Sequence, residues 1–276
     1  AAYGTVVGGT SVGGIVGYTS GDVELKDCRN ATIIKGQTRI GGIVGYMEGT
    51  TTSKPLVSHC VNIGTIQMVG EISDQLDSRP YGGGLVGLAE HAVIKNVMNA
   101  GLVEAGATSV SQYGHHDGPS CGGVVGFATD ITIDSALVVN RVRALVKDAT
   151  TNMLIGSFSP GCNFFNCFAD ESFVFGDGHI YTSRTENYAT SDMVGNGMKS
   201  LLPTWHFNVG RFPTPCTTES LIDSIASLPI YLAAGDYPSS VQHDFKLTPM
   251  TGLTWTSSNS NVMIVSGDSA LLKASS

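Results

Sequence analysis

Gly41-Gly42-Ile43-Val44-Gly45-Tyr46 is one of four copies of the same pattern, in which two glycines, a hydrophobic residue, valine and a third glycine precede another hydrophobic residue. The other copies occupy residues 13–18, 83–88 and 122–127, and residues 153–157 form a degenerate fifth copy. The first glycines lie 28, 42 and 39 residues apart. A repeat with variable spacing indicates a structural unit that recurs with loops of different length.

The similarity between copies continues beyond the glycines. After a polar turn, each copy has a second apolar segment in which one position is small and apolar: Cys28, Cys60, Val97, Ala136 and Cys167. Two residues later, three copies carry asparagine: Asn30, Asn62 and Asn99. A third short apolar segment follows in the first three copies, at residues 32–34, 65–68 and 102–104. Each unit therefore predicts short β-strands with equivalent residues in equivalent places.

Units of two or three short strands cannot bury an apolar face alone, but stacked units form a continuous core. The sequence thus predicts an all-β fold, a parallel β-helix or β-solenoid, with strands of neighbouring units about 4.8 Å apart. Glycine at the sharp corners allows positive φ or close backbone approach, and asparagine amides can bond along the stack. The hand of parallel crossover connections favours a right-handed coil.

The Gly-Gly-Ile/Leu-Val-Gly core, followed by Asn-Cys or Cys-x-Asn and a Gly-hydrophobic strand, resembles the GLUG-motif repeats of bacterial surface proteins, over residues 4 to about 180. Such repeats occur in large adhesins, in filamentous-haemagglutinin-like exoproteins and in the non-catalytic part of some bacterial IgA-cleaving metallopeptidases. The resemblance implies a scaffold and transfers no active site. Because Tyr3-Gly4-Thr5-Val6-Val7-Gly8 resembles the closing strand of a repeat, we expect the chain to begin inside a coil, with an open edge.

Three parts are predicted along the chain: repeats at 1–180, a capping or linker segment at 181–218, and a partial immunoglobulin-like domain at 219–276. In the second part, Trp205 is expected to cover the last coil, and the prolines near 213–215 to stop further pairing. In the third part, residues 228–232, 241–247 and 253–259 are predicted strands. The stretch around Trp255 resembles the front half of bacterial immunoglobulin-like spacer modules, shortened relative to a complete sandwich.

Six cysteines in an exported protein would suggest disulfides. However, Cys28, Cys60 and Cys167 share a repeat position with Val97 and Ala136, so we expect free, packed thiols there. The sequence leaves the state of the other three open: Cys121, Cys162 and Cys216.

Charge and hydropathy argue against nucleic acid as a partner and against a membrane-spanning segment. The chain has a net charge of −8 and 15 scattered Lys and Arg residues, which argues against nucleic-acid binding. No apolar stretch approaches the roughly 18 residues that a membrane span needs. We expect an extracellular or bacterial cell-surface protein that has lost any signal peptide.

Candidate catalytic motifs have simpler interpretations. His115-His116-Asp117 is interpreted as an exposed loop tip, since no third metal ligand accompanies it, and Gly267-Asp268-Ser269 as a turn. A third cluster, Asp170, Glu171 and Asp177, could supply glycosidase carboxylates but is more typical of a strand rim. The zinc-peptidase pattern His-Glu-x-x-His, the P-loop and the dinucleotide fingerprint are missing from the sequence. We therefore predict no catalytic residue, cofactor or metal site, and no enzymatic activity.

Three functions are compatible with these features. The first is an adhesin-like stalk whose loops at 49–56, 70–81 and 107–121 bind a host or community ligand, such as a glycan or matrix protein. The second is a carbohydrate-binding or carbohydrate-active module. Its aromatic ladder would consist of Tyr18, Tyr46 and Phe127, with Leu88 in the same column. The ladder either stacks on sugars or packs against loops or the core. The third is a structural subunit that associates end to end. The ligand-contact candidates are Tyr18, Tyr46, Tyr113, His115 and His116.

Overall fold

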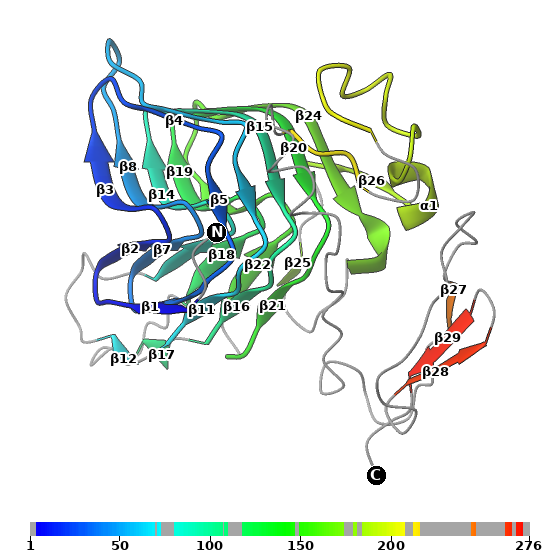
Figure 1. The fold of residues 1–276 in the computed structure, drawn as a ribbon. Helices are drawn as coiled ribbons and strands as arrows, with labels where there is room; N and C mark the ends of the chain where they lie inside the picture. Colours follow the sequence, from blue (N-terminus) through cyan, green and yellow to red (C-terminus); the bar gives the residue numbers. More distant parts are fainter. Residues whose placement is uncertain are drawn as a thin grey trace.

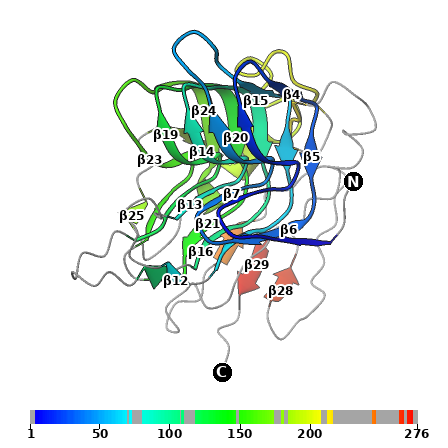
Figure 2. The same cartoon turned by 90° about the vertical axis from the view of Figure 1, so that its left-hand side faces the viewer.

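Most of the repeat region takes part in one stack of strands. The computed structural model describes residues 4–69, 71–72, 80–106, 108–109, 118–146, 149–173, 179–180, 184–207, 212–215, 244–246, 263–266 and 269–272. Within them the chain passes five times, in the same order, through four sheets, here named A to D. We call each pass a coil: residues 5–30, 33–62, 66–99, 103–138 and 142–170. Successive coils lie side by side in Figure 1 and one behind another in Figure 2.

Each sheet takes its strands from successive coils. Sheet A contains β1 (Thr5–Val7), β6 (Ile33–Gly36), β11 (Ile66–Met68), β16 (Val103–Ala105) and β21 (Val142–Ala144). Sheet B contains β2 (Ser11–Gly13), β7 (Arg39–Gly41), β13 (Tyr81–Gly83), β18 (Ser120–Gly122), β22 (Thr150–Asn152) and β25 (His179–Ile180). Sheet C contains β3 (Val16–Ser20), β8 (Val44–Glu48), β14 (Val86–Glu90), β19 (Val125–Thr129) and β23 (Ile155–Phe158).

Sheet D contains β4 (Glu24–Lys26), β5 (Arg29–Asn30), β9 (Leu56–Ser58), β10 (Val61–Asn62), β15 (Val93–Asn99), β20 (Thr132–Val138), β24 (Asn163–Asp170) and β26 (Glu186–Tyr188). A short pair outside these sheets, β12 (Glu71–Ile72) with β17 (Thr108–Ser109), joins two of the longer connections. Every strand pair in sheets A to D is parallel in the described part of the chain. The predicted all-β fold of stacked parallel sheets is confirmed, and it is consistent with a β-solenoid; the right hand stays a prediction.

The register places repeat positions directly above one another. Gly41 lies opposite Gly13 and Gly83, and Ala136 lies opposite Val97 and Cys167. The alignment of repeats inferred from the sequence is therefore the alignment that the sheets adopt.

Two apolar cores run along the stack. One fills the space between sheets A and B with side chains such as Ile34, Ile66 and Ile40. The other lies between sheets C and D and includes Val86 and Ile94. Because both cores are continuous through the coils, each coil buries its apolar side chains against the next.

The repeated glycines are required by close packing of backbone on backbone. A Cβ added at Gly45 would lie 2.5 Å from the backbone nitrogen of Val12, so a strand of sheet C approaches a strand of sheet B. A Cβ at Gly42 would lie 2.2 Å from the carbonyl oxygen of Gly84 and 2.6 Å from Cγ of Asn62. Positive φ among the described glycines occurs at Gly4, Gly21, Gly161 and Gly195, none of which belongs to the pattern. Of the two roles expected for these glycines, close approach is the one that the structure uses.

The asparagines form a buried ladder beside these glycines. Asn30 Nδ2 donates to Asn62 Oδ1 at 2.7 Å, and Asn62 Nδ2 donates to Asn99 Oδ1 at 2.8 Å. Each Oδ1 also accepts the backbone N–H two residues later, at Thr32, Gly64 and Gly101. The prediction that the amides bond along the stack is confirmed, and it explains how fully buried amides keep their hydrogen bonds.

A second column of corner residues was not predicted. Sheet D bends at one residue per coil that has a positive φ and precedes the small apolar position: Asp27, His59, Asn96, Ser135 and Asn166. Asn, Asp and His are the residues other than glycine that are enriched in this region, and Ser135 adopts it as well. The bend turns the following residue into the core, which is why the small apolar position recurs there.

The segment after the coils packs beside the stack as well as at its end. Trp205 is buried and donates Nε1 to Oδ1 of Asn96, in the third coil, at 2.9 Å. It belongs to a cluster that combines outward-facing residues of sheet D with this segment: Val61, Met98, Leu137, Phe168, Met193, Met198 and Leu202. The expectation that Trp205 covers the last coil is therefore corrected, since the indole lies against the flank of sheet D.

Short helical turns lead into this segment. They are η1 (Glu171–Phe173) and α1 (Thr190–Met193). Asp170 is buried and accepts a hydrogen bond from Oγ1 of Thr190 at 2.7 Å. This carboxylate joins the last coil to the segment that follows it.

The C-terminal part contains antiparallel strands. β27 (Asp244–Lys246) and β28 (Met263–Ser266) both pair with β29 (Ser269–Leu272). Ser269, from the motif interpreted as a turn, lies in β29 opposite Ser266. β27 falls within the predicted strand 241–247, whereas β28 and β29 follow the last predicted strand. The immunoglobulin-like assignment stays a prediction, as do the three predicted parts of the chain.

Replacing Gly42 by alanine tests the role of backbone approach. The new Cβ would overlap backbone and a buried amide, so we expect Gly42→Ala to lower the free energy of unfolding by about 3 kcal/mol, measured by urea denaturation. Gly9→Ala is the matched control, because a Cβ there meets nothing within 4 Å, and its effect should stay below about 0.5 kcal/mol. Equal effects of the two substitutions would contradict the close-approach explanation.

Candidate functional site

Sheets B and C meet at the glycine-rich corner, and their outward-facing residues lie next to each other there. Tyr18, Tyr46, Leu88 and Phe127 are in register on neighbouring strands of sheet C, as the repeat predicts. Tyr18 is 51% exposed, whereas Leu88 is 6% exposed. The predicted column exists, and its accessible aromatic end is the end at the first two coils.

Residues of sheet B complete this surface. The rings of Tyr18 and Tyr46 have centroids 5.2 Å apart, and the Arg39 guanidinium lies 4.6 Å from the centroid of Tyr46. Tyr81 and Phe127 form a second ring pair, at 4.9 Å. We call these five residues the aromatic face: Tyr18, Arg39, Tyr46, Tyr81 and Phe127.

Two carboxylates hold the tyrosine rings in place. The Tyr18 hydroxyl donates to Oε2 of Glu48, and the Tyr46 hydroxyl donates to Oε2 of Glu90, both at 2.5 Å. The Glu48 carboxylate raises the pKa of Tyr18. Partial burial, followed by the hydrogen bond to Glu90, raises the pKa of Tyr46. Both phenols therefore stay neutral at physiological pH and keep their orientation, while Arg39 brings a cation to the same place.

The same corner ends in a cavity at the fifth coil. Oγ of Ser120 and Oγ of Ser157 lie 2.7 Å apart, beyond the aromatic face. A cavity of about 280 Å³ follows, lined by residues that include Asn152, Phe158 and Arg184. The Arg184 guanidinium lies 5.0 Å from the centroid of the Phe158 ring. Aromatic rings beside cations and hydroxyls thus occur at both ends of this corner.

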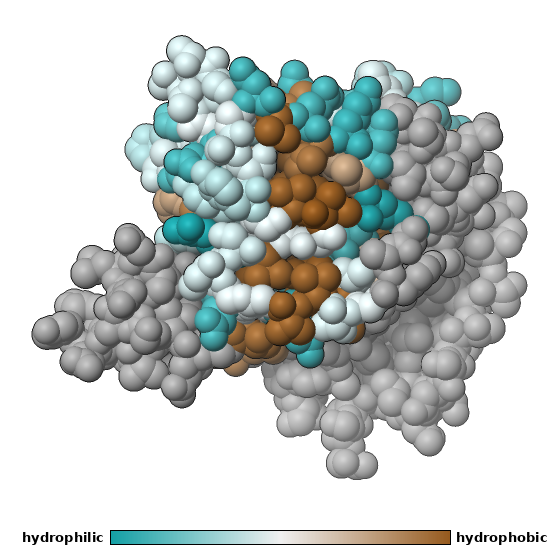
Figure 3. Space-filling model, turned by 60° about the vertical axis from the view of Figure 1, so that its left-hand side comes forward, coloured by the Kyte–Doolittle hydropathy of each residue, from teal (hydrophilic) through white to brown (hydrophobic). Residues whose placement is uncertain are grey.

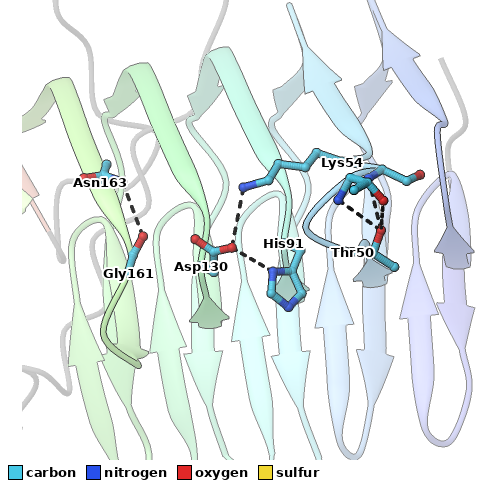
Figure 4. A network of polar contacts seen from close by, with 8 residues as sticks. Thr50, Lys54, His91, Asp130, Gly161 and Asn163 are labelled. Carbon is cyan, nitrogen blue, oxygen red and sulfur yellow. Dashed lines mark hydrogen bonds and ion pairs between the residues drawn. The ribbon is translucent and has the colours of Figure 1, made fainter.

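A polar network lies at the outer end of sheet C (Figure 4). Oδ2 of Asp130 is 2.7 Å from Nδ1 of His91 and 3.5 Å from Nζ of Lys54. The contact with His91, and then the charge of Lys54, lower the pKa of Asp130. Since Lys54 comes from the connection 49–55, the network ties that connection to the third and fourth coils. The loop at 49–56 that was predicted to carry a ligand is therefore held in a defined place.

Several predicted site residues cannot be compared with the structure. Tyr113, His115 and His116 lie outside the described residues, as do Asp177 and most of the loops 70–81 and 107–121. Glu171 is exposed, and the Asp170 carboxylate is used in the packing contact with Thr190. Within the described ranges, no three His, Cys, Asp or Glu side chains gather where they could hold a metal ion. The expectation that this chain is not an enzyme stays a prediction.

Sequence reasoning found the tyrosines but missed the groups around them. Arg39 and Tyr81 stand two residues before the paired glycines, and Glu48 and Glu90 stand two residues after the last position of the pattern. The glutamates recur at one offset in two copies, but the position two residues before the glycines is serine in the other copies, at Ser11 and Ser120, so no constant residue type marks the set. The meaning of these positions depends on the sharp corner, which brings the positions before and after the glycines together.

No protein-family model matches the sequence, and neither a curated protein nor a solved structure matches it. The resemblance to GLUG-motif repeats therefore depends on the residues themselves. Among the described residues, no helix has the length and apolar character needed to cross a bilayer.

The raised pKa of Tyr46 predicts a pH dependence. The pKa of Tyr46 is higher in the folded protein than in the unfolded chain. The neutral phenol therefore stabilises the fold below about pH 10, and this stabilisation is lost as the pH rises through the folded-state pKa. We expect the free energy of unfolding to fall above about pH 10, and Tyr46→Phe to make that fall shallower. Urea denaturation at pH values between about 8 and 11 measures both slopes. Identical slopes in the two proteins would show that Tyr46 does not titrate as described.

Proposed function

We propose that this chain is a non-catalytic, adhesin-like binding protein of the extracellular space or bacterial cell surface, a β-solenoid of the GLUG type that binds a glycan on its aromatic face. The observation that carries the proposal is the pair formed by exposed Tyr18 and partly exposed Tyr46, which lie in register and are each held by a carboxylate. Fixed rings lose little conformational entropy when a ligand binds, which favours affinity.

The chemistry of the face suits sugars. A pyranose has an apolar face that stacks on an aromatic ring and hydroxyl groups that need hydrogen-bond partners. Here Tyr18 and Tyr46 offer rings, while Glu48, Glu90 and Arg39 offer acceptors and donors beside them. Ligand sites generally combine apolar and aromatic surface with a few placed polar groups.

The charge of the face disfavours polyanions. Glu48 and Glu90 lie beside the rings, and the whole chain carries a net charge of −8. A nucleic acid needs several cations along its phosphates, and at this face Arg39 is the cation that contacts a ring. A neutral glycan, laid along the stack so that it meets successive coils, fits better than a nucleic acid.

The surroundings of the face support an adhesin-like role. The stacked sheets form an extended scaffold, and Lys54, His91 and Asp130 hold a loop at its side. The antiparallel strands β27 to β29 are compatible with an immunoglobulin-like spacer, which would increase the reach of the scaffold.

Glycan binding can be measured with a neutral oligosaccharide selected from an array. We expect Tyr18→Ala and Tyr46→Ala each to weaken its binding at least about fivefold in calorimetry, because a stacked ring contributes on the order of 1 kcal/mol. Phe165→Ala is the matched control, since Phe165 is 55% exposed and lies on sheet D. Binding that is absent from the array, or equally lost in all three variants, would overturn the proposal.

End-to-end association is a second candidate function, favoured by the surface of the first coil. This coil exposes Val7, Ile15 and Val23, and Ile33 at the start of the second coil is exposed as well. In Figure 3, apolar residues form a band across the face on this side of the molecule. Contiguous apolar surface and open strand edges are sites where β-proteins associate.

Sedimentation velocity tests this second candidate. We expect the protein to form concentration-dependent oligomers, and Val7→Lys to reduce them, because Val7 is 71% exposed and lysine opposes edge pairing. Leu145→Lys is the control, because Leu145 is also exposed but directly follows β21 in the fifth coil, away from the first coil. A monomer at every concentration would exclude this function.

A further inference from the structure

Two cysteines of neighbouring coils lie directly above one another in sheet D. Lys26 is opposite Ser58 and Arg29 is opposite Val61, so the register between them places Cys28 opposite Cys60. The hydrogen bond from the Val61 N–H to the Cys28 carbonyl, at 2.9 Å, lies within this register. Among the described cysteines, this is the pair that shares adjacent positions, since Cys167 stacks on Ala136.

The two side chains point the same way. The Cys28 thiol donates a hydrogen bond to the carbonyl oxygen of Lys26 at 3.4 Å, and the Cys60 thiol donates one to the carbonyl oxygen of Ser58 at 3.1 Å. Each sulfur thus bonds the carbonyl two residues before it, and Sγ of Cys60 also reaches the carbonyl of Leu25 in the first coil, at 3.5 Å. Strands of one sheet are about 4.8 Å apart, which is within the Cα separation that a disulfide bridges.

The two thiols differ in access and acidity. Cys28 is partly exposed, whereas Cys60 has no exposed surface. The neighbouring Cys60 side chain lowers the pKa of Cys28 to about 7, while the contact with Cys28, followed by burial, raises the pKa of Cys60. An accessible, acidic thiol beside a second thiol is the arrangement in which one cysteine attacks and the other resolves.

We propose that Cys28 and Cys60 form a reversible, redox-sensitive disulfide that links the first coil to the second, with Cys28 as the attacking thiol. Cβ atoms of directly stacked residues are also about 4.8 Å apart, slightly beyond the usual 4.5 Å for a disulfide, so the bond is strained and easily reduced. Such a bond acts as a switch, because strained disulfides have more oxidising potentials.

The oxidant is a low-molecular-weight disulfide such as oxidised glutathione. The Cys28 thiolate attacks one of its sulfurs, the S–S bond breaks, and one glutathione leaves as a thiolate that takes up a proton. Cys60 then loses its proton and attacks the Cys28 sulfur, which releases the second glutathione as a thiol. Two protein thiols are oxidised, one glutathione disulfide is reduced to two thiols, and the thiol protons balance.

The cross-link would control how firmly the first coil is held. Among the described strands, β1 to β5 pair only with strands of the second coil. A covalent bond between coils keeps the first coil in place when its hydrogen bonds open. Since the first coil also supplies Tyr18, oxidation would stabilise one end of the aromatic face.

The experiment treats the full chain, first reduced, with oxidised glutathione and then maps its cysteines by alkylation and mass spectrometry. We expect the loss of two thiols, a Cys28–Cys60 cross-linked peptide, and full recovery on reduction. Cys60→Val should instead retain one glutathione at Cys28, and Cys28→Ala should show neither product. Valine is tolerated at the equivalent Val97, so Cys60→Val preserves the fold.

Cys167→Ala is the matched control and should behave as the wild type, because Cys167 occupies the same repeat position without a stacked cysteine. A second readout is the alkylation rate of Cys28 in the reduced native protein at about pH 7, which Cys60→Val should lower roughly tenfold as the Cys28 pKa returns towards its ordinary value. Retention of both thiols under oxidising conditions, a cross-link between other cysteines, or an alkylation rate that Cys60→Val leaves unchanged would overturn the proposal.

Discussion

Close approach of backbones at the corner between sheets B and C is the constraint on which the structure depends. At Gly42 and Gly45 a single added carbon would overlap a carbonyl oxygen, a backbone nitrogen or a buried amide. Both apolar cores lie on either side of this contact, so a coil that widened there would lose register with its neighbours on all four sheets. The repeat is therefore conserved from coil to coil at the glycines and varies in the connections, where added length does not disturb the stack.

Exact stacking also creates the chemistry of the surface. A residue type that recurs at one repeat position becomes a column, and columns make the Asn30–Asn62–Asn99 amide ladder inside and the tyrosine pair outside. The same rule places Cys28 on Cys60. Buried polar columns are stable only when each member is satisfied, and the asparagines achieve this through each other and through backbone N–H groups.

Much of the fold could be predicted because its determinants are local and repeated. The glycine pattern predicts the strands and the corner, and the alignment of Cys28, Cys60, Val97, Ala136 and Cys167 predicts the register that the sheets adopt. The tyrosine column of the candidate site was predicted in the same way. The positive-φ column through His59 and Asn96 was missed, since its members are of four residue types and none is glycine, so no constant residue marks the bend.

The sequence by itself determined the repeating unit, its parallel stacking and the columns of like residues, because each depends on residue identity at fixed spacing. Only the tertiary structure decided that Arg39 lies over Tyr46, that Glu48 and Glu90 hold the tyrosine hydroxyls, and that Trp205 lies on the flank of sheet D against Asn96. These contacts join residues from different strands, coils or segments. Their geometry follows from how the chain turns at each corner and where the last segment packs, which no periodicity in the sequence encodes.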